Sequence, residues 1–240
     1  MSTNTIDNPK VVSREQWLAA RKKLLAKEKQ LTRERDTLAG ERRQLPWVKV
    51  DKNYVFESPD GKKTLAELFD GRSQLIVYHF MFGPEWNEGC PSCSFNMDHT
   101  DGALPHLAQR DVSFAAVSRA PLSKIDPFKK RMGWRFAWVS SFGTDFNYDY
   151  RASFTPEEMA KSKVEYNFDL VEFPSAEAPG ISVFYKDKSG TIFHTYSAYG
   201  PKTLSTPTTI STLFPKAAMR MASPSPCRGS AIMIATRMAT

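Results

Sequence analysis

An apolar run over residues 75–82 is followed, after a short loop, by Cys90-Pro91-Ser92-Cys93. The run is too continuously apolar to alternate, so it predicts a strand that is covered on both faces, as the strands of parallel sheets are. Two thiols three positions apart, in the loop that leaves such a strand, can close a small disulfide or bind a soft metal, and few other roles use both. This placement constrains the fold and the chemistry together.

The segments around this strand predict an α/β domain. We expect strands over 48–50, 54–56, 112–118 and 136–139, a turn at 59–61, helices over 64–69, from the thiols toward 107 and over 123–132, and a hairpin of 181–185 with 191–196. This order is that of a thioredoxin-like fold, with a central mixed sheet flanked by helices. The cysteines would then lie at the carboxyl end of a parallel strand, where open α/β sheets place their catalytic sites.

Residues 1–45 predict a long, basic, amphipathic helix ahead of the domain at 46–200. Ser13 and Gln16 can form a capping box at its start, and Pro46 ends it. Large apolar residues recur every seven positions, at 17, 24, 31, 38 and 45, but charged residues fill the other seam positions of a coiled coil. We therefore expect a narrow apolar stripe that packs on the domain or on a second copy in a homo-oligomer.

The net charge of +7 belongs to the two ends of the chain. Residues 1–52 hold 13 basic and 7 acidic residues, 53–200 hold 15 and 19, and 201–240 hold 5 and none. Because the middle is slightly acidic, the charge indicates solvated ends, and nucleic acid is not expected as a partner. No run of roughly 20 apolar residues and no secretory signal is visible, which predicts a cytoplasmic protein without a membrane partner.

The positions of Cys90 and Cys93 at the start of a helix predict a different role for each thiol. If Cys90 is the N-cap of a helix, Pro91 occupies the first turn, where its missing N–H costs nothing. The positive end of the helix then lowers the pKa of Cys90 from about 8.5 toward the range of about 3.5–7.5. Cys93, one turn deeper, would resolve a mixed disulfide. The sequence thus predicts a dithiol–disulfide oxidoreductase acting on a thiol or disulfide substrate, and no organic cofactor, since no G-x-G-x-x-G is present.

Several segments of the chain match a known family: Pro46-Trp47-Val48, Tyr54-Val55-Phe56, Phe69-Asp70-Gly71-Arg72-Ser73-Gln74-Leu75, Tyr78-His79-Phe80-Met81-Phe82-Gly83-Pro84, Gly89-Cys90-Pro91-Ser92-Cys93-Ser94-Phe95, Val117-Ser118-Arg119-Ala120-Pro121 and Trp138-Val139-Ser140-Ser141-Phe142-Gly143. From about Arg14 to Tyr199 the chain resembles the DUF899 family of thioredoxin-like bacterial proteins. The resemblance implies a thioredoxin-like fold of the peroxiredoxin-related type and supplies no substrate. Relatives usually carry an aromatic residue where this chain has Asn96, so the lining of the site is expected to differ.

Residues between and opposite the thiols are candidates to support them. Pro91 and Ser92 would tune the stability of the thiolate. Pro179, just before the hairpin, is a candidate for the cis-proline that thioredoxin-like domains place opposite their thiols. Peroxiredoxins need Thr or Ser three residues before the peroxidatic cysteine, and Asn87 at that position disfavours peroxide reduction.

Charged and aromatic residues near the thiols allow two interpretations each. Arg119 could offset the carboxylates of Glu85 and Glu88, which would otherwise raise the pKa of a nearby thiol, although a solvated loop arginine is the commoner case. Trp86 belongs to an aromatic cluster that could form an apolar floor for a substrate, although such density is more typical of a core. The other members of the cluster are Tyr78, Phe80, Phe82, Phe95, Trp134 and Trp138.

The alternative is a non-catalytic redox sensor or metal-binding protein whose basic helix binds a partner. His99 and His106, assisted by His79, could join the thiols around a metal, but this spacing matches no usual zinc pattern and the two helical histidines would not both point back to the helix start. His79, inside an apolar strand, is more typical of a core histidine. Salt-sensitive retention on DNA would favour this alternative, and loss of disulfide reduction in Cys90→Ser would favour the enzyme.

The C-terminal segment, residues 201–240, departs from the family. It holds no acidic residue, five Pro and four Met, whereas relatives continue with a Tyr-rich segment and a Pro-Lys-Gly-Arg-Asp stretch. With suitable codons, residues 204–221 can be read in another frame as a string that ends in Pro-Lys-Gly-Arg-Asp-Glu-Asp. We therefore expect either a frameshifted end or a disordered tail rich in Ser, Thr and Pro.

Overall fold

The computed structural model describes residues 10–200, and the chain divides into two compact units, Met1–Gln44 and Leu45–Thr240. The first unit holds the helix α1 (Arg14–Arg42). It begins with the expected capping box, in which Ser13 Oγ accepts from the N–H of Gln16 at 3.3 Å and the Gln16 side chain accepts from the N–H of Ser13 at 3.2 Å. The predicted helix is confirmed. What its apolar stripe packs against stays a prediction.

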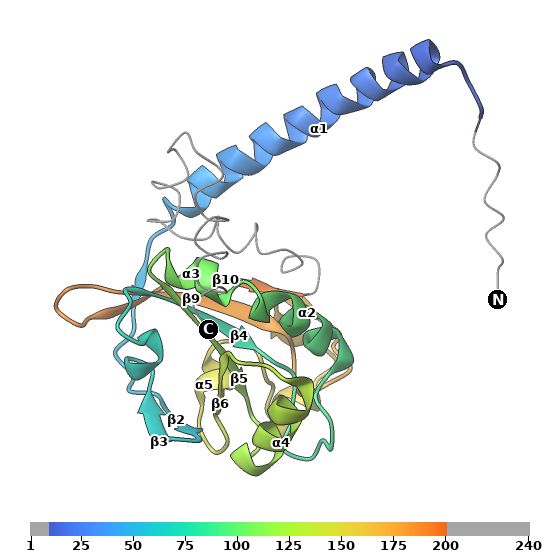
Figure 1. Ribbon diagram of the computed structural model, residues 1–240. Coiled ribbons are helices and arrows are strands. Elements are labelled where there is room, and N and C mark those ends of the chain that lie inside the picture. Colours follow the sequence, from blue (N-terminus) through green and yellow to red (C-terminus); the bar gives the residue numbers. More distant parts are fainter. Residues whose placement is uncertain (1–9, 201–240) are drawn as a thin grey trace. The chain divides into compact units, whose positions relative to one another are not determined.

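The second unit is built on one mixed sheet (Figure 1). Within residues 10–200, eight strands lie in the order β1-β10-β9-β4-β5-β6-β2-β3. Their bounds are β1 (Val48–Lys49), β2 (Val55–Ser58), β3 (Gly61–Thr64), β4 (Gln74–His79), β5 (Val112–Ser118), β6 (Ala137–Ser140), β9 (Gly180–Lys186) and β10 (Ile192–Tyr199). The strands β4, β5 and β6 run parallel, and the remaining neighbours pair antiparallel.

The centre of this sheet has the connectivity of a thioredoxin-like domain. The parallel strands β4 and β5 are adjacent and are joined through helices, while the antiparallel hairpin of β9 and β10 extends the sheet on the other side of β4. Every residue of β4 and of β5 is buried, as strands covered on both faces must be. The predicted fold class is therefore confirmed by the strand order itself.

Successive residues of β4 point to opposite faces of the sheet and so belong to two separate cores. Ile76 and Tyr78 pack with residues of α2 (Pro91–Asp101), α3 (Leu104–Ala108) and α4 (Leu122–Met132). Leu75 and Val77 pack with residues of β2, of the 3-10 helix Glu67–Phe69 and of α5 (Phe146–Asp149). The thiols lie on the first of these faces.

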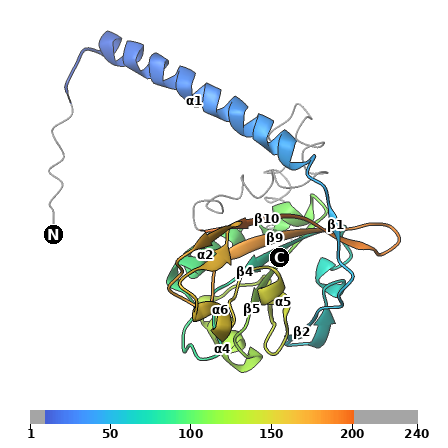
Figure 2. The ribbon, with the colours of Figure 1, turned by 180° about the vertical axis from the view of Figure 1, so that it is seen from behind.

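Three parts of the domain differ from the sequence-based expectation. In place of the helix expected over 64–69, the strand β3 ends at Thr64 and only Glu67–Phe69 is helical, as a 3-10 helix. The helix expected from the thiols toward Leu107 is interrupted after Asp101, so α2 and α3 are separate helices. Between β6 and β9, where no element was expected, the chain forms α5, α6 (Pro156–Met159) and the two-stranded sheet of β7 (Val164–Tyr166) and β8 (Asp169–Val171). Figure 2 shows α5 and α6 from behind. This segment, residues 141–179, forms a third small apolar core together with Tyr199 of β10.

The expected tail, residues 201–240, lies outside the described residues. Within the part of the chain that the structure describes, no helix has the length and apolar character needed to cross a membrane.

Candidate functional site

The thiols stand where the chain leaves β4 and starts α2. Cys90 is the N-cap residue of α2, and Pro91 is in its first turn. The N–H of Cys90 donates to the carbonyl of Met81 at 3.0 Å, which closes the loop between strand and helix. Gly89 is required here, because a Cβ at this position would lie 2.7 Å from a ring carbon of Phe80. Cys90 is half-buried, whereas Cys93 is only 1% exposed.

The two free thiols have opposite protonation tendencies. The hydrogen bond from the Cys93 side chain, helped by the backbone N–H groups of Cys93 and Ser92, lowers the pKa of Cys90 to about 6 against the effect of burial. The same hydrogen bond to Cys90, together with burial, raises the pKa of Cys93 well above its usual range. One proton is thus held on the buried sulfur and the exposed sulfur is a thiolate near neutral pH.

A pocket of about 230 Å³ opens at the thiols. It is lined by Tyr78, Met81, Cys90, Ser92, Cys93, Asn96, Phe173 and Pro179. Most of its surface is apolar, and the polar atoms that it offers belong to the thiols, one hydroxyl from each of Tyr78 and Ser92, and the amide of Asn96. Cys90 is the more accessible of the two thiols from this pocket, because Cys93 lies one turn deeper in α2.

Tyr78 brings a hydroxyl group to the buried sulfur. Its side chain is hydrogen-bonded to Cys93, and Asn96 Nδ2 donates to the Tyr78 hydroxyl at 3.3 Å. Burial, followed by the charge of Cys93, raises the pKa of Tyr78 far above its usual value, so this residue is a neutral hydrogen-bond donor. The sequence placed Tyr78 only in an apolar cluster. Its position on the same face of β4 as the helix that carries the thiols is the signal that identifies it.

The segment 141–179 supplies the other side of the pocket. Phe173, which packs on the small apolar core of this segment, and Pro179, which precedes β9, both line the pocket. Pro179 therefore lies opposite the thiols as expected. No cis peptide bond occurs within residues 10–200, so Pro179 is trans and is not the cis-proline for which it was a candidate. Sequence reasoning missed Phe173, since nothing in its surroundings predicted an element.

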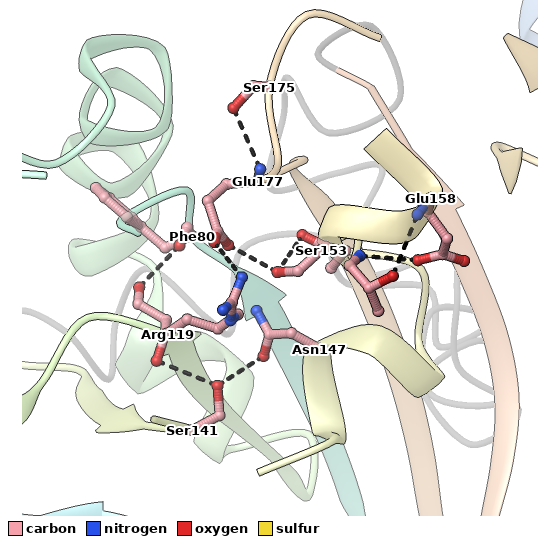
Figure 3. A network of polar contacts seen from close by, with 11 residues as sticks. Phe80, Arg119, Ser141, Asn147, Ser153, Glu158, Ser175 and Glu177 are labelled. Atoms are coloured by element: carbon pink, nitrogen blue, oxygen red, sulfur yellow. Dashed lines mark hydrogen bonds and ion pairs between the residues drawn. The ribbon is translucent and has the colours of Figure 1, made fainter. Parts of the chain in front are cut away.

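Arg119 does not offset the loop carboxylates but pairs with a buried one. Its Nη1 lies 2.8 Å from Glu177 Oε1, and its guanidinium group lies 4.6 Å from the ring centre of Tyr148. Ser153 Oγ donates to the other oxygen of Glu177 at 2.7 Å. Figure 3 shows the Glu177 carboxylate between Arg119 and Ser153. We name Arg119, Ser153 and Glu177 the carboxylate clamp.

The carboxylate clamp holds residues 173–179 in place. This stretch lines the pocket through Phe173 and Pro179, and we call it the pocket roof. Glu177 is 3% exposed and lies two residues before Pro179, and burial raises the pKa of its carboxyl group. The N–H of Ala178 donates to the carbonyl of Ala152 at 2.9 Å, which ties the same stretch by its backbone. Arg119, at the carboxyl end of β5, thus anchors the roof to the sheet and is absent from the pocket lining.

The remaining loop candidates lie outside the pocket. Trp86 packs against the core on the thiol face and does not line the pocket, so its core interpretation is the better one. Glu88 pairs with Arg131, which lowers the pKa of that carboxyl group. Asn87 is exposed and lines a different depression, between the loop and α4. The position at which peroxiredoxins carry Thr or Ser therefore does not face the thiols.

The histidines do not assemble around the thiols. His79 points to the opposite face of the sheet, is fully buried and has Nε2 at 2.8 Å from Ser182 Oγ, and burial lowers its pKa to about 3. His99 Nδ1 lies 2.7 Å from the carbonyl oxygen of Phe95 in its own helix. Within residues 10–200, no three side chains of His, Cys, Asp or Glu converge as metal ligands.

Comparison with known proteins identifies the family. The family model described as "Bacterial protein of unknown function (DUF899)" matches residues 6–214. The chain belongs to this family. The match runs farther than the resemblance seen in the sequence, which ended at about Tyr199. A search of curated proteins found no match.

Solved structures similar to this chain include peroxiredoxins. A cysteine-to-serine mutant of Xylella fastidiosa PrxQ is 13% identical, with 70% of this chain and 91% of that chain covered and a TM-score of 0.48. Peroxidoxin BcpB from Mycobacterium tuberculosis is 12% identical, with 75% and 97% covered and a TM-score of 0.46. Xanthomonas campestris peroxiredoxin Q is 13% identical, with 70% and 90% covered and a TM-score of 0.45. At these identities and TM-scores the likeness carries no argument about the site, which follows from this chain's own residues.

Proposed function

We propose that this protein is a dithiol–disulfide oxidoreductase in which Cys90 is the nucleophile and Cys93 the resolving thiol. The observation that carries the proposal is the division of roles within the pair. Cys90 is accessible from a pocket and has a lowered pKa, while Cys93 is buried and holds its proton. A metal clip would need further ligands, and a structural disulfide would not need an accessible thiolate.

The reaction follows from these roles. The Cys90 thiolate attacks one sulfur of a substrate disulfide, forming a mixed disulfide and releasing the first substrate thiolate, which takes a proton from water. Cys93 then attacks the sulfur of Cys90, releases the second substrate thiolate and gives up its own proton to it. The substrate gains two electrons, and the protein dithiol becomes the Cys90–Cys93 disulfide. A second dithiol system must reduce this disulfide again.

An alkylation and intact-mass titration tests the proposal. Purified protein is equilibrated in glutathione and dithiothreitol buffers, the free thiols are alkylated, and the Cys90–Cys93 disulfide is scored at each potential. We expect a reversible transition between about −120 and −270 mV, the range of thiol exchange catalysts. Absence of the disulfide under oxidising conditions, or thiols that react only after a chelator is added, would contradict the proposal and favour a metal site.

The matched variants assign the roles. Cys93→Ser should accumulate a mixed disulfide on Cys90, and Cys90→Ser should accumulate none. Cys227, the third cysteine, lies outside the described residues, so the titration is repeated in Cys227→Ser to show that it does not exchange with the pair. An unchanged transition in that variant is expected.

We also propose that the protein works in a reducing, cytoplasmic compartment. The argument is that an exposed thiolate beside a buried thiol is useful where thiols are kept reduced and disulfides are transient. The substrate would be a thiol or disulfide compound. Trapping of the pair in intact cells by rapid acid quenching would find it mainly reduced, and a fully oxidised pair would contradict this proposal.

A further inference from the structure

Among the described residues, 10–200, those that line the pocket at the thiols carry no charged side chain apart from the Cys90 thiolate itself. Of the eight residues that line it, Met81, Phe173 and Pro179 are apolar and the others are neutral polar residues or thiols. Ligand pockets hold charged groups by opposing charges or by several hydrogen bonds, because an unpaired buried charge is costly. The lining offers a charged substrate no opposing charge, and the Tyr78 hydroxyl and the Asn96 amide are already bonded to Cys93 and to Tyr78.

Three basic residues contact the loop before the thiols or the stretch that ends at Pro179, and each is engaged with a group outside the pocket. Arg119 is held by Glu177 in the carboxylate clamp. Arg131 pairs with Glu88, and Lys124 Nζ donates to the carbonyl oxygens of Pro84 at 2.7 Å and of Trp86 at 3.0 Å. None of these three basic residues lines the thiol pocket. A substrate carboxylate would have to be buried here without a counter-ion.

The positive end of α2 does not supply that counter-ion. Its first backbone N–H groups, those of Ser92 and Cys93, stabilise the Cys90 thiolate. The thiolate is itself an anion, so a second negative charge brought to the same helix end would be repelled. The positive end of α2 therefore stabilises the Cys90 thiolate and does not attract an anionic substrate.

Resting on the function proposed above, we propose that the substrate is a small disulfide whose groups next to the sulfur are uncharged and mainly apolar. Its apolar group lies against Met81, Phe173 and Pro179 while its sulfur meets Cys90. The volume of about 230 Å³ suits a small group, because pockets for larger ligands measure about 300–1,000 Å³. In the balanced reaction, one such disulfide takes two electrons from the Cys90–Cys93 pair, one proton from Cys93 and one from water, and leaves as two thiols.

Two disulfides of equal chain length test this inference. Reduced protein is mixed with dipropyl disulfide or with 3,3′-dithiodipropionate, and formation of the Cys90–Cys93 disulfide is followed by acid quenching and mass spectrometry. Each rate constant is divided by that of the same compound with dithiothreitol alone, which removes intrinsic reactivity and the repulsion by a free thiolate. We expect the normalised rate to be at least tenfold higher for dipropyl disulfide.

The outcomes separate this inference from the proposed function. Equal normalised rates, or faster reaction of 3,3′-dithiodipropionate, would overturn the substrate class while leaving the exchange activity intact. Oxidation of the pair by neither compound, nor by bis(2-hydroxyethyl) disulfide, would overturn the proposed function and this inference with it.

Variants of one lining residue test the electrostatic cause. Asn96→Lys adds a cation at the pocket, and Asn96→Met is its uncharged control of similar length. We expect Asn96→Lys to reduce the preference for dipropyl disulfide at least threefold and Asn96→Met to keep it. An unchanged preference in Asn96→Lys would contradict the explanation that dipropyl disulfide is preferred because the pocket lining lacks positive charge.

Discussion

Tyr78 and His79 are neighbours on β4, and both are buried ionisable residues with displaced pKa values, yet they belong to different surroundings. Tyr78 faces the thiols and lines an open pocket. His79 faces the other core, stacks on Phe146 and is linked to Ser182. The difference shows that burial alone displaces a pKa, and that a candidate site needs access to solvent and a reactive partner as well.

The largest effect is expected from replacing Cys90, the proposed nucleophile, which lies on the face of the sheet to which Tyr78 points. Cys90→Ser should lower the rate of disulfide exchange on the order of a thousandfold or more, since a hydroxyl group near neutral pH is not ionised. The measurement is the rate of reduction of bis(2-hydroxyethyl) disulfide with dithiothreitol in excess, above the rate without protein. As the control, His79→Leu should keep the rate within about twofold. A large loss of rate in that variant would contradict the assignment of His79 to the core.

The next largest effect concerns the roof of the pocket. Glu177→Leu leaves Arg119 without its carboxylate, and we expect the free energy of unfolding to fall by about 2–3 kcal/mol, less than for a fully buried pair because Arg119 is 20% exposed. Urea denaturation measures it. Glu57→Leu, at an exposed position of β2, is the control and should change stability by less than about 0.5 kcal/mol. Equal effects of the two substitutions would contradict the carboxylate clamp.

On the His79 face the expected effect is on stability and not on exchange. His79→Leu removes the hydrogen bond with Ser182 and should cost about 1–3 kcal/mol at pH 7. Urea denaturation of the variant and the wild type measures this difference. A stable variant that has lost disulfide exchange would instead assign His79 to the site.

The same variant gives a pH dependence with a definite sign. Burial lowers the pKa of His79 to about 3 in the folded protein, whereas the unfolded chain has a pKa of about 6.5. Below pH 6.5 the unfolded state binds the proton and the folded state does not, so this contribution to stability is lost as pH falls toward 3. The stability of the wild type relative to His79→Leu should fall by up to about 1.4 kcal/mol per pH unit in this window. A constant difference would contradict a neutral buried His79.

The smallest effect is expected from removing one tyrosine hydroxyl group, that of Tyr78. Tyr78→Phe removes a hydrogen bond that lowers the pKa of Cys93, and we expect release of the mixed disulfide to slow about two- to tenfold, as the loss of about 0.5–1.4 kcal/mol implies. Tyr54→Phe is the matched control, because its hydroxyl donates to Asp149 on the other face. Stopped-flow measurement of the resolving step compares them. Equal slowing in both variants would remove Tyr78 from the mechanism.

The sequence predicted the elements whose signals are local. The strand at 112–118 was predicted with its observed bounds, because its length and its content of β-branched and aromatic residues favour a buried strand over a helix. The capping box of Ser13 and Gln16 and the thiols at a helix start depend on spacing within one turn. These signals need no knowledge of distant residues, so they could be interpreted before the structure.

The rest depends on contacts between residues far apart in the chain. Arg119 and Glu177 are 58 positions apart, and nothing local distinguishes Glu177 from a solvated carboxylate. Phe173 reaches the thiols only because the segment 141–179 folds on a small core that it forms together with Tyr199. Pro179 lines the pocket with the thiols, and its peptide isomer, which the sequence left open, is trans, since the position follows from the fold but the isomer does not.

The pH dependence of alkylation tests the division of the two thiols most directly. Reduced protein is treated briefly with iodoacetamide between pH 4 and 10, and the modified cysteine is identified by peptide mass mapping. In the Cys227→Ser protein, we expect Cys90 to react with a midpoint near its pKa of about 6 and Cys93 to stay unmodified throughout the range. A midpoint near the ordinary thiol value of about 8.5, or equal modification of both cysteines, would contradict this expectation.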